Sequence, residues 1–482
     1  MNRPPIHPTL SRVATVFRGT SARIRSPISK TVSAAFSGLL LWSCGAPLEQ
    51  VSFNQAHTVP PQPVATALSV RSESRSEAKE VNRQAWGVRT PLAQFFLALR
   101  GLESNVRKDH VRILWFGDSH TAADFLTGRL RTQMQRQFGN GGPGFVRIGA
   151  KHSRHDDVEN QRQGRWLQRP RSPASHRVEE QGVLGVSGIK VRPRDGSASA
   201  RVRARERRGL QQLDWSLVFR PLSERVRFSV QLGNQINNLD LRDFGQSASG
   251  ASVSVRGSQL LGLQLKGSAK SVLRVYGFRG QVELFGVYLE NDKPGVILDS
   301  MGINGARART HEAWHQGVFW GEVAERDPQL IVLAYGTNEL GDTKPVHEFF
   351  TYYESFLQQA RAVVPRADCL LVGPTDRLGR SGKSMQRARL MDEAQADFAA
   401  RLGCEYFSLF QQMQRQGGYS GWAKLRPPLA AQDGVHLKFE GYRQLADSLF
   451  ERLMAGYSEA SEPASSSAPA STAGATSPPR SK

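Results

Sequence analysis

Cysteine is scarce in this chain of 482 residues, which contains only Cys44, Cys369 and Cys404. So few cysteines exclude a small fold held together by disulfides, and the length is sufficient to bury a substantial core in more than one domain. Cys369 and Cys404 each lie in a short apolar run. In an exported protein they could pair, but two buried free thiols are equally compatible with these positions.

Acidic residues are in deficit, with 43 Asp and Glu against 64 Lys and Arg and a formal net charge of +21. Such a charge favours polyanionic partners, of which nucleic acid is the obvious one. The arginines, however, are scattered through the first forty residues and through 147–227, with few aromatic residues among them. This pattern favours a solvated surface that meets acidic envelope polymers, and we expect no nucleic-acid partner.

Metal-ligand spacing is also lacking. The region 152–176 contains three histidines and two aspartates whose spacing matches no common ligand pattern, namely His152, His155, Asp156, Asp157 and His176. Arginines and serines surround them, which indicates an exposed loop. We therefore expect no metal and no cofactor.

The N-terminus has the layout of an export signal. Five basic residues between Arg12 and Lys30 precede an apolar stretch, 31–42, that is too short to span a membrane as a helix. Leu41-Trp42-Ser43-Cys44 resembles a bacterial lipobox, which would make Cys44 the lipidated first residue of the mature protein. The alternative is a cleaved signal without a lipid. Residues 1–44 are thus a predicted signal peptide, 45–83 a disordered linker and 458–482 a disordered tail.

A serine lies at a predicted strand-to-helix turn. The apolar run 111–116 reads as a strand, breaks at Gly117-Asp118-Ser119, and is followed by a helical pattern that ends at Gly139. Backbone N–H groups at the start of a helix favour developing negative charge, so the position suits a nucleophile. Asp118 is expected to form the turn, and a simple helix cap is the alternative reading.

Two further segments carry residue types that a serine nucleophile needs. The buried strand expected at 328–334 leads into a loop with Asn338, and the segment 431–437 supplies Asp433 and His436 three residues apart. Together and in this order, the three segments resemble the SGNH/GDSL hydrolases. The form Gly-Asp-Ser-His-Thr-Ala, with a glycine-rich turn at 139–144 and a long β-rich insertion, is similar to the periplasmic peptidoglycan O-acetylesterases of that superfamily.

The resemblance implies a role for each matching residue. Ser119 matches the nucleophile, and His436 and Asp433 match the base and the carboxylate of the catalytic triad. The N–H of Ser119, the N–H of Gly305 and the side chain of Asn338 would form the oxyanion hole. Gly302 and the segment 185–188 compete with Gly305 for the glycine position. His120, where many members carry leucine, is expected to be pocket wall.

Short apolar strands alternate with helical patterns from 84 to 194 and again from 292 to 457. This alternation predicts an α/β fold, and the resemblance implies an SGNH-type, flavodoxin-like parallel sheet with helices on both faces. Between the two parts, residues 195–291 alternate with period two and predict an inserted antiparallel β-sandwich. The resemblance makes carbohydrate binding by this module an open option, although Trp215 and Tyr276 are expected in its core.

These features predict an exported serine esterase, lipid-anchored in the periplasm or at the outer membrane. Its expected reaction is the removal of O-acetyl groups from an envelope polysaccharide, with peptidoglycan as the polysaccharide that the resemblance implies. An acetyltransferase that uses the same residues on a cell-surface glycan is one alternative. A non-catalytic wall-binding lipoprotein is the other, and the presence of every reactive residue type argues against it.

Overall fold

The computed structural model describes residues 90–460, except 152, 171–181, 208, 243–245, 248–252, 257–258 and 380–385. The predicted signal peptide with Cys44, the predicted linker and residues 461–482 of the predicted tail lie outside the described residues. Within the described part, no helix has the length and apolarity needed to cross a membrane.

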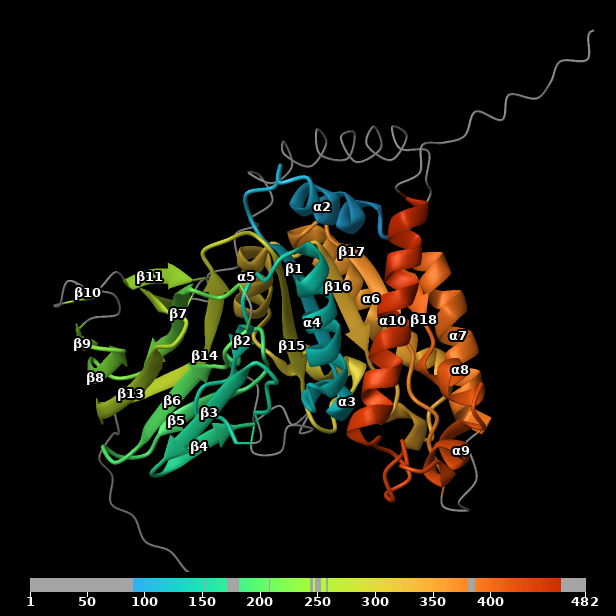
Figure 1. The fold of residues 1–482 in the computed structure, drawn as a ribbon. Helices are drawn as coiled ribbons and strands as arrows, with labels where there is room; N and C mark the ends of the chain where they lie inside the picture. Colours follow the sequence, from blue (N-terminus) through green and yellow to red (C-terminus); the bar gives the residue numbers. More distant parts are fainter. Residues whose placement is uncertain are drawn as a thin grey trace, which may run out of the picture. The chain divides into compact units, whose positions relative to one another are not determined.

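A parallel five-stranded sheet forms one half of the fold (Figure 1). Its strands, in spatial order, are β15 (Val296–Gly302), β1 (Val111–Gly117), β16 (Leu330–Ala334), β17 (Asp368–Val372) and β18 (Glu405–Phe407). Every neighbouring pair is parallel. The strands are nearly continuous apolar runs because both faces of the sheet are covered.

Helices cover the two faces of this sheet. One face carries α2 (Ala93–Glu103), α4 (Phe125–Phe138) and α10 (Phe439–Glu459), and the other carries α5 (Gln316–Arg326), α6 (Val346–Val363) and α7 (Gln386–Leu402). Alternate side chains of β1 therefore enter different cores: Ile113 and Trp115 pack with the first set of helices, Leu114 and Phe116 with the second. The predicted α/β fold class is confirmed.

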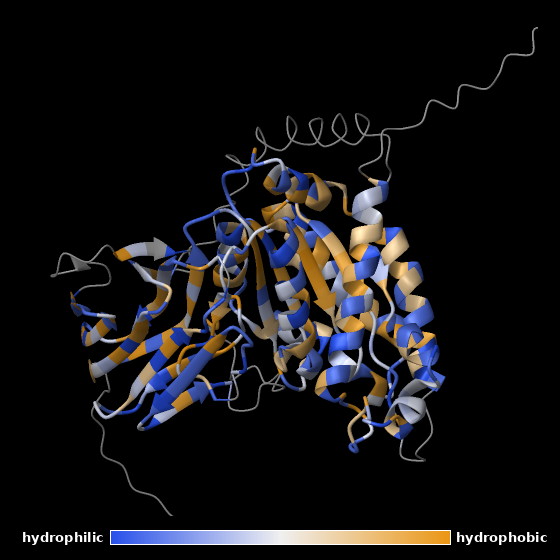
Figure 2. Ribbon diagram, in the orientation of Figure 1, coloured by the Kyte–Doolittle hydropathy of each residue, from blue (hydrophilic) through white to orange (hydrophobic). Residues whose placement is uncertain are grey.

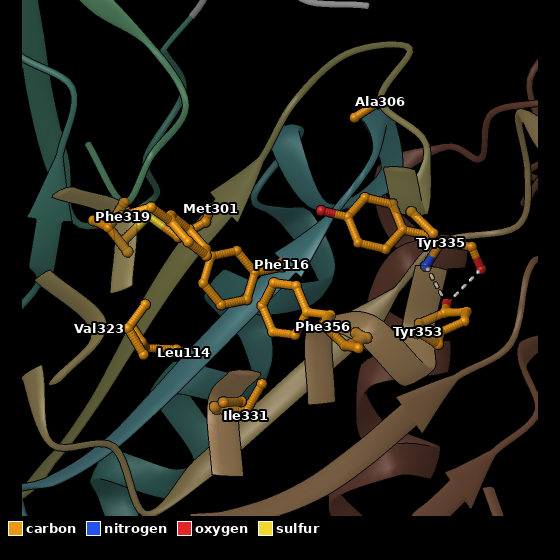
Figure 3. Close-up of a cluster of buried hydrophobic side chains, with 14 of the residues drawn as sticks. Leu114, Phe116, Met301, Ala306, Phe319, Val323, Ile331, Tyr335, Tyr353 and Phe356 are labelled. Atoms are coloured by element: carbon orange, nitrogen blue, oxygen red, sulfur yellow. Dashed lines mark hydrogen bonds between the residues drawn. The ribbon is translucent and has the colours of Figure 1, made fainter. Parts of the chain in front are cut away.

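Figure 3 shows the core between the sheet and the second set of helices. The ring of Phe116 lies edge-on to two helical rings, with centroids 5.8 Å from Phe319 and 5.3 Å from Phe356. At the right of the cluster in Figure 3, the backbone N–H of Tyr335 donates to the Tyr353 hydroxyl at 3.3 Å. Aromatic packing and this bond hold the segment that follows β16 against α6.

The register of the sheet brings three strand ends to one edge. Gly117, the last residue of β1, pairs with Gly302 of β15 and with Ala334 of β16. A Cβ on Gly117 would lie 2.1 Å from the Thr121 hydroxyl oxygen, so only glycine allows the chain to turn back over the strand here. The segments after the three strands, which carry Ser119, Gly305 and Asn338, therefore begin side by side.

Two antiparallel sheets form the rest of the fold. The first contains β10 (Gln246–Ser247), β9 (Gln235–Arg242), β8 (Arg225–Leu232), β13 (Val272–Arg279), β6 (Ser199–Ala204) and β3 (Val158–Gln163). The second contains β11 (Val253–Arg256), β12 (Leu260–Ser268), β7 (Gln212–Pro221), β14 (Val282–Asn291), β5 (Lys190–Pro193) and β4 (Trp166–Arg169), with β2 (Gly144–Val146) paired to β14. Apolar and polar residues alternate along β6 and β8 of the first sheet, whereas β14 of the second sheet is buried along nearly its whole length (Figure 2).

The antiparallel strands start earlier than the alternation suggested. β3, β4 and β5 precede residue 195, and β3 reads Val-Glu-Asn-Gln-Arg-Gln, in which only Val158 is apolar. A strand with so little apolar character gives no period-two signal. Trp215 is fully buried in the core of this module, as expected, whereas Tyr276 is only half-buried on the outer face of its sheet.

The helix after Ser119 is not continuous. α3 (Ser119–Ala122) ends one turn later, and α4 starts only after Asp124, whose φ of 50° is left-handed. The Asp124 carboxylate accepts hydrogen bonds from the Thr127 hydroxyl at 2.6 Å and from Arg131 at 2.8 Å. These bonds hold the unusual backbone conformation, which the helical pattern alone did not indicate.

Cys369 of β17 and Cys404, directly before β18, form a disulfide with a Cα–Cα distance of 4.8 Å. The sequence left this pairing open. Adjacent parallel strands bring the two residues together.

Buried charges connect the antiparallel sheets to the parallel half, and we call this region the seam. In the seam, Arg131 binds Asp124 and Asp157 at 2.8 Å each. Arg326 of α5 contacts Asp299 of β15 at 2.7 Å and also contacts Glu290 of β14, in the antiparallel sheets. The expectation that 152–157 forms an exposed loop is wrong for His155 and Asp157, which are 7% and 4% exposed. Arg131 compensates the charge of Asp157, which the local sequence could not reveal.

Candidate active site

Ser119 begins α3 at the edge where the parallel strands end. Asp118 precedes it, and the Oδ1 atom of Asp118 accepts a hydrogen bond from the backbone N–H of His120 at 2.9 Å. Asp118 is 1% exposed, and burial raises its pKa to about 6. Asp118 thus shapes the turn, as expected, and leaves the half-buried Ser119 hydroxyl free to face the residues opposite.

His436 lies opposite Ser119, with the Nε2 atom of His436 2.9 Å from the Ser119 hydroxyl oxygen. The Nδ1 atom of His436 lies 2.7 Å from the Oδ2 atom of Asp433. The other carboxylate oxygen of Asp433 accepts the backbone N–H groups of Val435 and His436, both at 2.9 Å. The structure thus joins a hydroxyl, an imidazole and a carboxylate in one chain of contacts.

The charge of Asp433 determines which imidazole nitrogen carries the proton. Burial raises the pKa of Asp433, but the hydrogen bonds from the side chain and backbone of His436 outweigh it and hold the pKa below its usual range. An ionised Asp433 only accepts, so Nδ1 of a neutral His436 carries the proton and Nε2 is free to accept from Ser119. The His436 and Asp433 side chains are 42% and 51% exposed, so water reaches them.

Tyr419 of α9 (Gly418–Lys424) supports the loop that carries Asp433 and His436. Its hydroxyl lies 2.7 Å from the carbonyl oxygen of His436 and 2.9 Å from that of Ala431, and donates to the loop. The tyrosine itself is 1% exposed. The sequence does not reveal this role of Tyr419, because nothing in the pattern around it links it to a loop beyond its own helix.

His120, expected to be pocket wall, lies behind His436 with ring centroids 5.3 Å apart. Its Nδ1 atom is 2.9 Å from the Tyr442 hydroxyl, and its Nε2 atom is 3.4 Å from the Thr375 hydroxyl. Burial lowers the pKa of His120 to about 3, so the ring stays neutral at physiological pH. A neutral, hydrogen-bonded ring packs against His436 without adding charge to it.

Asn338 follows β16 and is connected to the turn that contains Gly305. The Nδ2 atom of Asn338 donates to the carbonyl oxygen of Ala306 at 2.9 Å, which fixes the orientation of the amide and leaves its second N–H available. Gly305 has a φ of +74°, a conformation that favours glycine. This turn starts beside the Ser119 strand, because the N–H of Ile303 donates to the carbonyl oxygen of Gly117 at 3.0 Å.

The competing glycines lie at closely packed positions. A Cβ on Gly302 would lie 2.1 Å from the backbone nitrogen of Ala122, so this glycine lets β15 approach α3. Cβ atoms on Gly185 and Gly188 would meet Glu322 at 2.6 Å and Trp314 at 2.2 Å. These contacts explain why each of these positions requires glycine, and Gly305 as oxyanion donor stays a prediction.

Two side chains that the sequence did not single out hold the Asn338 loop to the Gly305 turn. The Nη2 atom of Arg307 donates to the Asn338 carbonyl oxygen at 3.3 Å. The Oε1 atom of Glu339 accepts the N–H of Ala308 at 2.8 Å. Both bonds run between the two segments, so they hold the Asn338 loop against the turn that contains Gly305.

The site has the components of acyl transfer through a serine. No group of three or more His, Cys, Asp or Glu side chains suited to a metal ion occurs among the described residues. The imidazole can take the Ser119 proton, and the N-terminus of α3 with the Asn338 amide offers hydrogen-bond donors nearby.

Residues 267–444 match the model of the GDSL-like Lipase/Acylhydrolase family. The later part of the chain thus matches a family of acylhydrolases. The matched range includes Gly305, Asn338, Asp433 and His436, whereas Ser119 lies before it in the sequence. No significant match was found among curated proteins.

Among solved structures, the chain is similar to a peptidoglycan O-acetylesterase, with 22% sequence identity and a TM-score of 0.62. The match covers 78% of this chain and 98% of that chain, so the shared fold includes the antiparallel sheets. An acetyl xylan esterase matches at 18% identity and a TM-score of 0.27 over 34% of this chain and 82% of its own. A lipase/acylhydrolase from Enterococcus faecalis matches at 17% sequence identity and a TM-score of 0.26, over 34% of this chain and 77% of its own.

Proposed function

We propose that this protein is an exported serine esterase that removes O-acetyl groups from an envelope polysaccharide, with peptidoglycan as that polysaccharide. The observation that carries the catalytic part is the chain of contacts from Ser119 through His436 to Asp433. The similarity to a peptidoglycan O-acetylesterase over most of both chains supports the choice of substrate.

In the proposed mechanism, His436 Nε2 takes the Ser119 proton while the serine oxygen attacks the acetyl carbonyl carbon. The N–H groups of Ser119 and Gly305 and the Asn338 amide stabilise the oxyanion. The tetrahedral intermediate expels the sugar oxygen, which receives the proton from His436. Water then attacks the acetyl-serine with His436 as base and releases acetate. Asp433 holds His436 in the required tautomer.

Hydrolysis is favoured over acetyl transfer because His436 and Asp433 are 42% and 51% exposed. Water therefore reaches the base from the solvent side. An acetyltransferase must keep water from its acyl-enzyme until the acceptor sugar binds.

The test is acetate release from O-acetylated peptidoglycan by the wild type and by Ser119→Ala. We expect the variant to lose release by a factor of about 10⁴ or more, because without the serine only the oxyanion donors remain. Ser104→Ala, at the exposed end of α2, is the control and should match the wild type. Equal release by Ser119→Ala would reject the serine mechanism, and acetyl transfer to an added glycan without acetate would support a transferase.

The antiparallel module has a hollow of about 300 Å³ on the outer face of its six-stranded sheet. Gln161, Arg201, Gln231, Arg274 and Tyr276 line it. Amide and guanidinium groups hydrogen-bond sugar hydroxyls, and a half-exposed tyrosine ring can pack on a sugar face. We propose that this face contacts the polysaccharide. Retention of Tyr276→Ala on insoluble peptidoglycan equal to that of the wild type would reject this contact.

Export and lipidation at Cys44 are proposed from the N-terminal sequence alone. Metabolic labelling with a fatty acid should mark the wild type and not Cys44→Ala. Label that persists on the variant, or never appears on the wild type, would reject the anchor and leave the cleaved soluble signal.

A further inference from the structure

A small hollow lies beside the Gly305 turn and the Asn338 loop, with a volume of about 30 Å³. A cavity needs about 10–15 Å³ to hold one water molecule, so this hollow accommodates about two oxygen-sized atoms. Four basic side chains line it: Arg307, Arg309, Lys344 and Arg387. Its size and its charge both fit a carboxylate group.

Two of these four cations already have carboxylate partners. Arg307 contacts Asp342 at 2.8 Å, and Lys344 contacts Glu348 at 3.0 Å. Arg309 and Arg387 form no ion pair with any carboxylate in the described part of the chain. The charges of these two arginines are therefore the ones left for a ligand.

Hydrogen-bonding atoms around the hollow are also unsatisfied. The Nε atoms of Arg309 and Arg387 are buried and have no hydrogen-bond partner among the residues described. The same holds for the Oε2 atom of Glu339, which lines the same hollow. Buried polar groups normally find partners, so several orphans around one space indicate a missing polar group. Burial raises the pKa of Glu339 to about 7, so near neutrality part of this group is protonated and can donate a hydrogen bond.

The hollow adjoins the loop that carries Asn338, an oxyanion donor in the proposed mechanism. Arg307 lines the hollow and donates to the carbonyl oxygen of Asn338 at 3.3 Å. Glu339 lines it as well and directly follows Asn338 in the chain. This position beside Asn338 fits a second group of the substrate whose ester lies at Ser119. Lys344 and Glu348, 58% and 42% exposed, form a rim that is open to solvent.

We propose that Arg309 and Arg387 bind a carboxylate carried by the acetylated sugar, so that the enzyme selects acidic sugars over neutral ones. This inference rests on the proposed function and adds a substrate class to it. Two carboxylate oxygens can accept from two guanidinium groups, which is the geometry that favours arginine at such sites.

The test compares two acetylated amino sugars that differ in one group. The first carries an ether-linked carboxylate, and in the second that carboxylate is converted to a neutral amide. We expect the wild type to prefer the acid by about tenfold in kcat/KM, since bonds to a charged group are the stronger ones. In Arg309→Gln and in Arg387→Gln the ratio of acid to amide should fall toward one. The matched control is Arg389→Gln, on the same helix as Arg387, because Arg389 is already paired with Glu393.

A second measurement does not require turnover of a sugar ester. The acidic sugar without its acetyl group should inhibit hydrolysis of 4-nitrophenyl acetate competitively, with an inhibition constant about tenfold lower for the wild type than for Arg309→Gln or Arg387→Gln. A KM change for the acid without a matching kcat change would indicate binding rather than loss of fold, and thermal melting should agree with that of the wild type.

The outcomes separate this inference from the function on which it rests. Equal kcat/KM for acid and amide in the wild type, with acetate released from both, would reject the carboxylate site and leave the esterase intact. Hydrolysis of 4-nitrophenyl acetate with no release from either sugar would reject the glycan substrate, and inhibition by the acidic sugar would then still test the site. Equal loss for both substrates in the variants would reject a specific role for Arg309 and Arg387.

Discussion

The catalytic pair at the carboxyl edge of the parallel sheet and the ion pairs of the seam differ in how far they are exposed to solvent. At the edge, Asp433 and His436 are 51% and 42% exposed. In the seam, Arg131 and Asp124 are 0% and 1% exposed, and Arg326 is 4% exposed against Asp299 at 0%. The Asp433–His436 pair at the edge is therefore within reach of water, whereas the ion pairs of the seam are not.

This difference in exposure predicts which substitutions affect the reaction rate and which affect the stability of the fold. Exposed ion pairs contribute little to stability because solvent screens them, so the edge can be changed without unfolding the chain. A buried charge whose partner is removed is strongly destabilising. We therefore expect substitutions at the edge to change rate and substitutions in the seam to change stability.

The largest expected effect is that of His436→Ala on the rate. Loss of the base should reduce kcat by a factor of about 10⁴ or more, which corresponds to at least about 5 kcal/mol in the barrier. The free energy of unfolding should change by less than about 1 kcal/mol, because the side chain is half exposed. Steady-state kinetics and urea unfolding measure both, with the exposed His347→Ala as control. A loss of unfolding free energy larger than the rise in the activation barrier would contradict the view that the edge serves the reaction and not the stability.

Arg131→Met should have the largest effect on stability. It leaves the buried Asp124 without its arginine and Asp157 with only the partly exposed Arg207, at a cost of about 3–5 kcal/mol. Arg129→Met is the matched control on the same helix, since its pair with Asp447 is partly exposed and should contribute less than about 1 kcal/mol. Urea unfolding measures both variants. Equal losses of unfolding free energy in the two variants would show that burial does not make the seam ion pairs more important for stability.

Asn338→Ala, at the edge, tests whether the Asn338 amide acts in the transition state and not in the bound substrate. Removal of one oxyanion donor should raise the barrier by about 2.7–4 kcal/mol, seen as a fall in kcat with little change in KM. Asn304→Ala, exposed on the neighbouring turn, should leave kcat unchanged. If Asn338→Ala changed KM alone, the amide would contact the ground state and not the oxyanion.

Much of this edge could be predicted from the sequence. The nucleophile strand, the Asn338 loop and the Asp433–His436 spacing are local patterns, and the parallel arrangement of the strands brings their ends together. The supporting contacts could not be predicted. Tyr419 and Glu339 act through hydrogen bonds to other segments, and no periodicity in their own segment indicates which backbone groups they meet.

The seam was the least predictable part. His155 and Asp157 lie in a polar stretch that reads as a surface loop. The burial of Asp157 becomes favourable only because Arg131 and Arg207 approach it from other segments. Strand β3 is also polar, so the sequence pattern does not reveal that antiparallel strands begin before residue 195. The disulfide between Cys369 and Cys404 depends on strand adjacency, which spacing alone does not give.

Glu322→Gln tests whether burial in the seam makes the stability of the protein depend on pH. Glu322 lies in the seam at 2% exposure, and burial, stronger than the attraction of Arg256 and Arg326, raises its pKa to about 7. Between the ordinary value of 4.5 and about 7, the unfolded chain has released this proton while the folded chain keeps it. Stability from Glu322 is therefore complete below about pH 4.5 and is lost as the pH rises to about 7, by about 3 kcal/mol in all.

The variant has no proton to release, and its amide oxygen can still accept the N–H of Val186 that Glu322 accepts at 2.6 Å. Relative to the wild type, Glu322→Gln should therefore gain about 3 kcal/mol of unfolding free energy between pH 4.5 and pH 8. Urea unfolding at both pH values measures the gain. The exposed Glu354→Gln should show the same difference from the wild type at the two values. A gain at Glu354 equal to that at Glu322 would mean that burial in the seam does not control the titration.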